Sequence, residues 1–159
     1  EQMDTAAFYG CDNLESIEIP RSLKFYEDFL EAGSMTAIRA EGISLNDIPE
    51  KYRIQAAHGF AYYEERNEAL RLEYMDYIRK EIGILCKRAM KSMPLLRFLM
   101  AEELVGYDAL EEMLSKAIAD KDFELTASLL DYQGKVMSPE KLRQRAQKEE
   151  EKLDELWEF

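Results

Sequence analysis

From residue 48 onward, apolar residues recur every three to four positions, which is the spacing of amphipathic α-helices. The pattern predicts a first helix after Pro49, with Asp47 as its cap and with Ala57 and Phe60 facing inward. A longer second helix is predicted to follow, with Gly83 near its middle. Its inward stripe comprises Leu72, Met75, Ile78, Ile82, Leu85 and Ala89.

Three more helices are predicted between residues 94 and 134 from their start and stop signals. Pro94 opens the first, and Gly106 lies near its end. Asp108 and Asp122 are the predicted caps of the next two, and Gly134 is the predicted end of the last. Their inward faces comprise Leu95, Leu96, Leu99, Met100, Leu110, Met113, Leu114, Ala117, Ile118, Leu125, Leu129 and Leu130.

A final helix is predicted over 138–159, because Ser138-Pro139-Glu140 combines a cap, a first-turn proline and an early acid. Its apolar side chains are Leu142, Ala146, Leu153, Leu156 and Trp157. We expect this helix to cap the preceding helices by covering their last apolar face. The alternative is a coiled-coil or homodimer contact through Leu153, Trp157 and Phe159.

An internal repeat links the helical segments. Ala89 and Ala117 are 28 residues apart, as are Gly106 and Gly134, and Ala57 precedes Ala89 by 32 residues. A period near thirty with two short helices per unit is typical of an α-helical repeat stack. The predicted fold is therefore mostly α, with stacked helix pairs of an α-solenoid forming a helical repeat domain over 48–137.

The first part of the chain has a different pattern. Ile17-Glu18-Ile19 predicts a short strand that Pro20 ends, and a short helix from Leu23 to Leu30 follows, ended by Gly33. Residues 34–47 have no clear period. They are interpreted as a linker along the surface, with Ile43 and Leu45 tucked in.

Residues 7–20 follow the pattern Ala-Phe-x-Gly-Cys-x-x-Leu-x-x-Ile-x-Ile-Pro. This stretch resembles one repeat of the BspA-type leucine-rich repeat family. The matching residues are Ala7, Phe8, Gly10, Cys11, Leu14, Ile17, Ile19 and Pro20. The resemblance implies that 1–33 is a remnant of a longer array, in which Cys11 occupies a stacking position.

Residues 107–134 resemble an ankyrin-type helix pair, with an alanine in the first helix, a polar turn and a second helix that ends in Leu-Leu. The Thr-Pro-Leu-His motif and the glycine turn of true ankyrin repeats are missing, so clear hairpins are not expected. From Ile43 to about Gly134 the chain resembles the C-terminal helical region that follows BspA-type repeats in proteins of Gram-positive anaerobes. That family has no established activity, so the resemblance implies scaffold and recognition roles.

The net charge of −12 is concentrated in residues 1–47, which hold ten acidic and three basic side chains. An acidic chain repels phosphate backbones, so nucleic acid is not an expected partner. No stretch approaches the roughly 20 apolar residues that span a membrane. The compartment stays open: the cytoplasm is favoured, and the cell surface requires a signal elsewhere in a parent chain.

One local run is basic against this acidic background, with Glu81 as its single acid. Lys80, Lys87 and Lys91 share a predicted helical face. This face is a candidate surface for an acidic peptide or for the acidic 1–47 region, and the alternative is an ordinary solvated face. The run comprises Arg79, Lys80, Lys87, Arg88, Lys91 and Arg97.

A group of tyrosines supplies a second candidate surface, because tyrosine is enriched at protein interfaces. Tyrosine is equally suited to the edge of a core, and that alternative stays open. The group comprises Tyr52, Tyr62, Tyr63, Tyr74 and Tyr77. The residues predicted to bind a partner are Lys80, Lys87, Arg88, Lys91, Tyr62 and Tyr63.

The sequence offers little catalytic or metal-binding chemistry. His58 is the sole histidine and is interpreted as a hydrogen-bonded core residue, and Cys11 and Cys86 are interpreted as buried thiols. Zinc, calcium-loop, nucleophile-elbow and phosphate-loop motifs are all missing. No metal, cofactor or enzymatic activity is expected.

The favoured function is a non-enzymatic protein-protein interaction module, which binds another protein or the rest of a parent chain. A purely structural role, as the cap of a leucine-rich-repeat array, is the alternative. A small-molecule binder or enzyme is less favoured, since it requires a deep pocket with converging polar groups around His58, Tyr62 or Tyr63.

Overall fold

The computed structural model describes residues 13–21, 35–64 and 66–157. Within them the chain is mostly helical, which confirms the predicted mostly-α class. Cys11, Phe159 and the predicted helix Leu23–Leu30 lie outside the described residues. The chain divides into two compact units, Glu1–Val105 (unit 1) and Gly106–Phe159 (unit 2), so the division falls inside the predicted 48–137 domain.

Unit 1 begins with two short parallel strands, β1 (Ser16–Glu18) and β2 (Ala37–Arg39). β1 confirms the predicted strand, whereas β2 lies in the segment that was predicted as a linker, so that prediction is wrong. The reason is that Ala37 and Ile38 are both fully buried. A strand buried on both faces shows no polar-apolar alternation. Ile43 and Leu45 are buried, as expected.

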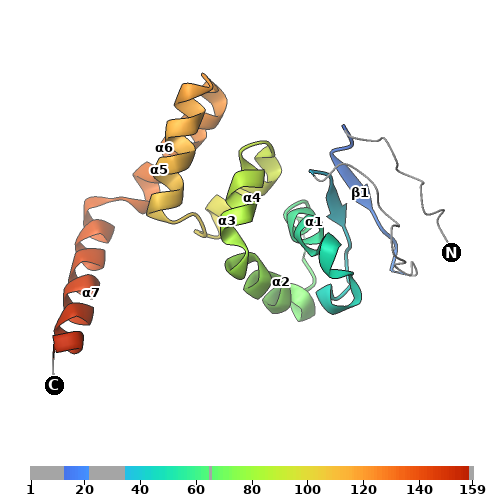
Figure 1. The fold of residues 1–159 in the computed structure, drawn as a ribbon, viewed down its shortest axis with the longest axis horizontal. Helices are drawn as coiled ribbons and strands as arrows, with labels where there is room; N and C mark the ends of the chain where they lie inside the picture. Colours follow the sequence, from blue (N-terminus) through green and yellow to red (C-terminus); the bar gives the residue numbers. More distant parts are fainter. Residues whose placement is uncertain (1–12, 22–34, 65, 158–159) are drawn as a thin grey trace. The chain divides into compact units, whose positions relative to one another are not determined.

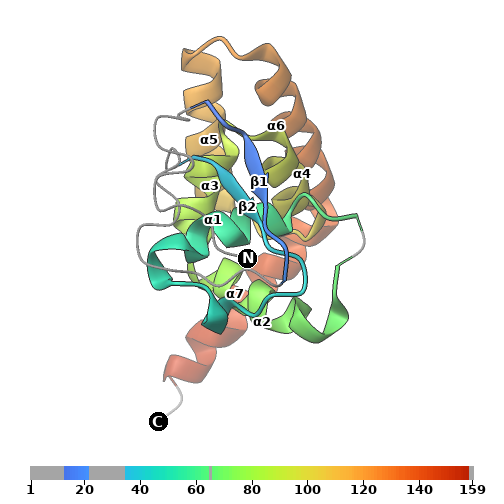
Figure 2. The same cartoon turned by 90° about the vertical axis from the view of Figure 1, so that its right-hand side faces the viewer.

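A 3₁₀ turn, η1 (Leu45–Asp47), leads into α1 (Glu50–Phe60). Pro49 occupies the N-cap position of α1 and Asp47 lies inside η1, so the predicted Asp47 cap is wrong. Ala57 and Phe60 are buried, as the helical spacing predicts. Figures 1 and 2 show α1 between the strand pair and the other helices of unit 1.

At Gly59, α1 contacts the backbone of β2 directly, with no side chain between them. A Cβ atom on Gly59 would lie 1.8 Å from the Ile38 carbonyl oxygen and 2.3 Å from its carbonyl carbon. Glycine is therefore required at this position, because it alone lets the helix approach the strand backbone so closely. Gln55 adds a hydrogen bond from its Nε2 to the Thr36 carbonyl oxygen at 3.0 Å.

Three helices complete unit 1: α2 (Glu68–Lys80), α3 (Ile82–Ala89) and α4 (Met93–Ala101). The single long helix predicted for α2 and α3 is interrupted at Glu81. Hydrogen bonds from Glu81 N to Tyr77 O and from Leu85 N to Glu81 O continue the helical pattern across the interruption. Leu72 was expected inward but is 74% exposed, because Tyr74, Met75 and Ile78 set the buried side of α2.

Unit 2 contains α5 (Tyr107–Ala119), α6 (Phe123–Val136) and α7 (Pro139–Trp157). α5 and α6 pack together through Leu110, Met113, Leu114, Ala117, Leu125, Leu129 and Tyr132, all buried. Asp122 caps α6 as predicted, with its Oδ1 accepting from Leu125 N at 3.1 Å. Asp108 does not cap α5, because the helix begins at Tyr107 and Gly106 is its N-cap.

Three further predictions for unit 2 are wrong. Gly134 does not end α6, which runs on to Val136. Ile118 and Leu130 are 61% and 50% exposed rather than inward, because the buried faces of α5 and α6 are narrower than the apolar pattern suggests.

α7 starts where Ser138-Pro139 predicts, but its apolar side chains lie largely in solvent. Leu142, Leu153, Leu156 and Trp157 are 46% to 77% exposed, so the expected cover over the last apolar face is not formed by them. Among the described helices, none has the length and apolarity needed to cross a membrane.

Replacing Gly59 by alanine tests the contact between α1 and β2. The added methyl group would overlap the Ile38 carbonyl, so Gly59→Ala should lower the free energy of unfolding by roughly 3 kcal/mol. Urea denaturation of the full chain measures the effect. A stability equal to that of the parent protein would contradict the close approach.

Gly134→Ala is the matched control. A Cβ on Gly134 would have no atom within 4 Å, and the residue lies inside α6. Alanine there should therefore stabilise the helix by up to about 1 kcal/mol. A loss of stability would indicate instead that Gly134 ends the helix in a left-handed conformation, as the sequence pattern predicts.

Candidate protein-binding surface

Three lysines of unit 1 form an exposed basic face. Lys80 ends α2, Lys87 lies on α3, and Lys91 lies two residues after the end of α3. Ile84, which is 49% exposed, lies between them in the sequence at the helical spacing. Lys80, Ile84, Lys87 and Lys91 are called the basic face below. None of the ion pairs formed between described residues involves these lysines.

Of the neighbouring acids that the structure describes, none forms an ion pair with these lysines. Arg79 pairs with Asp76 at 3.4 Å in an exposed i,i+3 contact, which has little energetic weight. The acidic 1–47 region is the predicted internal partner of the basic face. Among its described acids, Glu15 contacts Tyr62 and Glu18 contacts Arg39, so these two side chains are engaged elsewhere.

Arg88 does not belong to the basic face, and its prediction as a partner-binding residue is wrong. The residue is only 8% exposed, and its Nη2 and Nε atoms lie 3.1 Å and 3.3 Å from His58 Nδ1. In the sequence alone, the neighbouring Lys87 favours an exposed Arg88. The contrary signal is its helical spacing of three from Leu85, which is fully buried.

His58 joins α1 to α3 and to the turn before α4. Because Arg88 donates to Nδ1, the proton of the neutral ring is on Nε2, which donates to Ser92 Oγ at 2.9 Å. Burial and then the charge of Arg88 lower the pKa of His58 to about 4. The prediction of a hydrogen-bonded core histidine is confirmed, and the ring is neutral near pH 7.

Tyr62 and Tyr63 lie along the seam between the end of α1 and the strand segment. The Tyr62 hydroxyl donates to Glu15 Oε1 at 3.2 Å, and the Tyr63 hydroxyl accepts from Glu41 N at 2.9 Å. Burial raises the pKa of both phenols. These half-buried rings therefore belong to the edge of the core, the alternative that the sequence left open. Tyr52 and Tyr74 are fully inside it.

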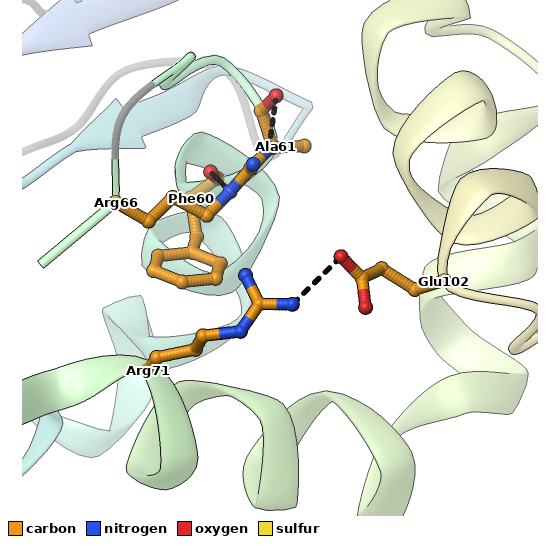
Figure 3. Close-up of polar contacts among 5 residues, drawn as sticks. All are labelled: Phe60, Ala61, Arg66, Arg71 and Glu102. Carbon is orange, nitrogen blue, oxygen red and sulfur yellow. Dashed lines mark hydrogen bonds and ion pairs between the residues drawn. The ribbon is translucent and has the colours of Figure 1, made fainter. Parts of the chain in front are cut away.

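Two arginines that the sequence did not single out hold α1, α2 and α4 together (Figure 3). Arg66 donates from Nε to Phe60 O at 3.1 Å and from Nη2 to Ala61 O at 3.2 Å, which satisfies carbonyls at the C-terminal end of α1. Arg71 Nη2 lies 2.8 Å from Glu102 Oε1, joining α2 to the end of α4.

Arg66 is also sandwiched against aromatic rings. Its guanidinium carbon lies 4.5 Å from the centre of the Phe98 ring and 5.3 Å from that of Phe60, which is the geometry of a cation–π contact. Burial and the neighbouring Arg71 lower the pKa of Arg66. Such contacts hold the helices of unit 1 in place.

A hollow beside these residues is too small for a substrate. It is lined by Phe60, Tyr63, Arg66, Leu70 and Tyr74, among others, and encloses about 10 Å³, the room of roughly one water molecule. In the part of the chain that the structure describes, no three histidine, cysteine or acidic side chains converge as metal ligands. Cys86 is a buried free thiol, as expected, with its pKa raised by burial.

Comparisons with protein-family models, with curated proteins and with solved structures find no match to this chain. The basic face therefore rests on its own geometry and charge.

The burial of His58, together with the charge of Arg88 beside it, makes stability depend on pH. The pKa of His58 is about 4 in the folded state and 6.5 for the free side chain, so the unfolded chain binds more protons between these values. Stability should therefore fall as the pH drops from 6.5 to 4, by roughly 3 kcal/mol in total. Urea denaturation across this range measures it.

His58→Gln separates this effect from the titration of carboxylates. Glutamine can accept from Arg88 and donate to Ser92 but carries no charge in this range, so its stability should change less with pH than that of the parent protein. Parallel pH profiles for the two proteins would show that His58 does not cause the loss.

Proposed function

We propose that this chain is a non-catalytic protein-interaction module whose basic face binds an acidic segment of a partner protein. The observation that carries the proposal is the set of three exposed lysines around Ile84, in a chain of net charge −12. None of the three forms an ion pair with another described residue. Local positive charge that an acidic protein keeps uncompensated is available for an external anion.

The chemistry of the face favours a peptide with acidic residues and one apolar side chain. Lysine ammonium groups attract carboxylates at long range and speed association, although each exposed pair adds little affinity. Ile84 supplies an apolar contact that a purely electrostatic surface would lack. Nucleic acid is the weaker candidate, because the acidic remainder of the chain repels a phosphate backbone.

The helix pairs support a repeat architecture as part of this proposal. Both α3–α4 and α5–α6 are short pairs in which the first helix ends near a fully buried alanine, Ala89 or Ala117. Lys121, between α5 and α6, has φ of 55°. That conformation favours glycine, the residue that ankyrin-type pairs carry at the turn between their helices. This agreement favours an ankyrin-like stack.

A second candidate function is the cap of a leucine-rich-repeat array, and the strand pair favours it. β1 and β2 are parallel, with Ser16, Ile17 and Glu18 each paired to a residue 21 positions later. Leucine-rich repeats contribute one strand every 20–29 residues, so this offset fits one repeat. Ile17 and Ile38 are paired and buried, and α1 covers β2 at Gly59. The two functions are compatible in one chain.

Charge reversal tests the interaction proposal. Lys80→Glu, Lys87→Glu and Lys91→Glu together should weaken binding of an acidic partner by at least about tenfold, since three attractions become repulsions. The melting temperature should change little, because all three side chains are exposed. Partners captured by the parent chain are titrated by calorimetry into the parent chain and into the triple variant, each at two salt concentrations.

The matched control carries the same change of charge elsewhere: Lys116→Glu, Lys121→Glu and Lys135→Glu, all on exposed positions of unit 2. A partner that binds all three proteins equally would overturn the assignment to the basic face. If none of the three captures a partner, the interaction function fails and the cap remains the better account.

A further inference from the structure

α7 presents an apolar stripe that nothing in the described structure covers fully. Leu142, Ala146, Leu153 and Leu156 follow one another at spacings of four, seven and three residues, which places them along one side of the helix. Leu142, Leu153 and Leu156 are 46%, 55% and 72% exposed, and Trp157 beside them is 77% exposed. Spacings of three, four and seven are those of a helix that packs against another helix.

The charges along α7 are divided between its two halves. Residues 140–148 carry four basic side chains and one acidic, whereas residues 149–157 carry five acidic and one basic. This order is unfavourable for the helix itself, because cations lie near the positive end of its dipole and anions near the negative end. In proteins, most of the stability of a helix comes from packing of its amphipathic face, so α7 needs a surface to pack against.

We propose that α7 of one molecule packs antiparallel against α7 of a second copy of this chain. In that arrangement the basic half of each helix lies beside the acidic half of the other, and the two helix dipoles oppose each other. Leu142 of one copy faces Leu153 of the other. Glu149, the one charged position on the stripe by sequence spacing, falls opposite Ala146 and next to the basic half of the second copy.

A parallel pair is disfavoured by the same charges, since it would set basic half against basic half and acidic half against acidic half. This inference is independent of the proposed function. The basic face lies in unit 1 and α7 in unit 2, so variants of one leave the residues of the other unchanged.

Two charge variants of the full chain test the orientation. Variant A, Lys141→Glu with Arg143→Glu, gives both halves of α7 a net negative charge. Variant B, Glu150→Lys with Glu151→Lys and Glu155→Lys, gives both halves a net positive charge. Light scattering after gel filtration, at low and at high salt, measures the mass of each protein and of the mixture. Circular dichroism checks that each variant stays folded.

We expect the parent chain to form a dimer that salt weakens, and each variant alone to dissociate at least about tenfold more readily. An equimolar mixture of A and B should form heterodimers, and a chain with all five substitutions, in which the two halves again carry opposite charge, should dimerise again. The mixture would associate in either orientation, whereas a parallel pair would not recover in the combined chain, and salt would strengthen it in the parent chain. Lys116→Glu with Lys121→Glu, which changes the charge as variant A does, should leave the dimer intact.

A parent chain that is monomeric at all concentrations would overturn the proposal. So would variants A and B that remain dimeric, or a mixture in which folded A and B fail to associate.

Discussion

At Gly59, helix α1 approaches the backbone of β2 so closely that a single methyl group would overlap the Ile38 carbonyl. The preceding residue, His58, points its hydrogen bonds the other way, to Arg88 of α3 and to Ser92 before α4. Two consecutive residues of α1 thus fix the strand pair on one side and the helices on the other. The arrangement of unit 1, and so the place of the basic face on it, depends on this short segment.

The polar groups around α1 serve the same purpose. His58 is neutral, so it can accept from the Arg88 guanidinium without a second buried positive charge. Arg66 satisfies the carbonyls at the end of α1, and Arg71 joins α2 to Glu102. Whereas these cations bond inward, Lys80, Lys87 and Lys91 are exposed and form no ion pair with another described residue.

The helical regions could be predicted from the sequence because they carry apolar stripes, and some also carry a correct end signal, such as the Asp122 cap and the Ser138-Pro139 start. β2 could not, since burial of both faces removes the alternation that marks a strand. The basic face was predicted from spacing, except that Arg88 turns inward. Its inward position depends on His58, thirty residues earlier, and such a long-range pairing leaves no local pattern.

The role of α1 as the joint of unit 1 is tested most directly by native-state hydrogen exchange at increasing denaturant. The amides of Ile19 and Ala37 bond across the strand pair, and those of Leu85 and Leu96 lie in α3 and α4. If α1 couples the strands to the helices, all four amides should exchange through one shared opening with the same free energy. Opening of the strand pair at a clearly lower free energy than α3 and α4 would contradict that coupling.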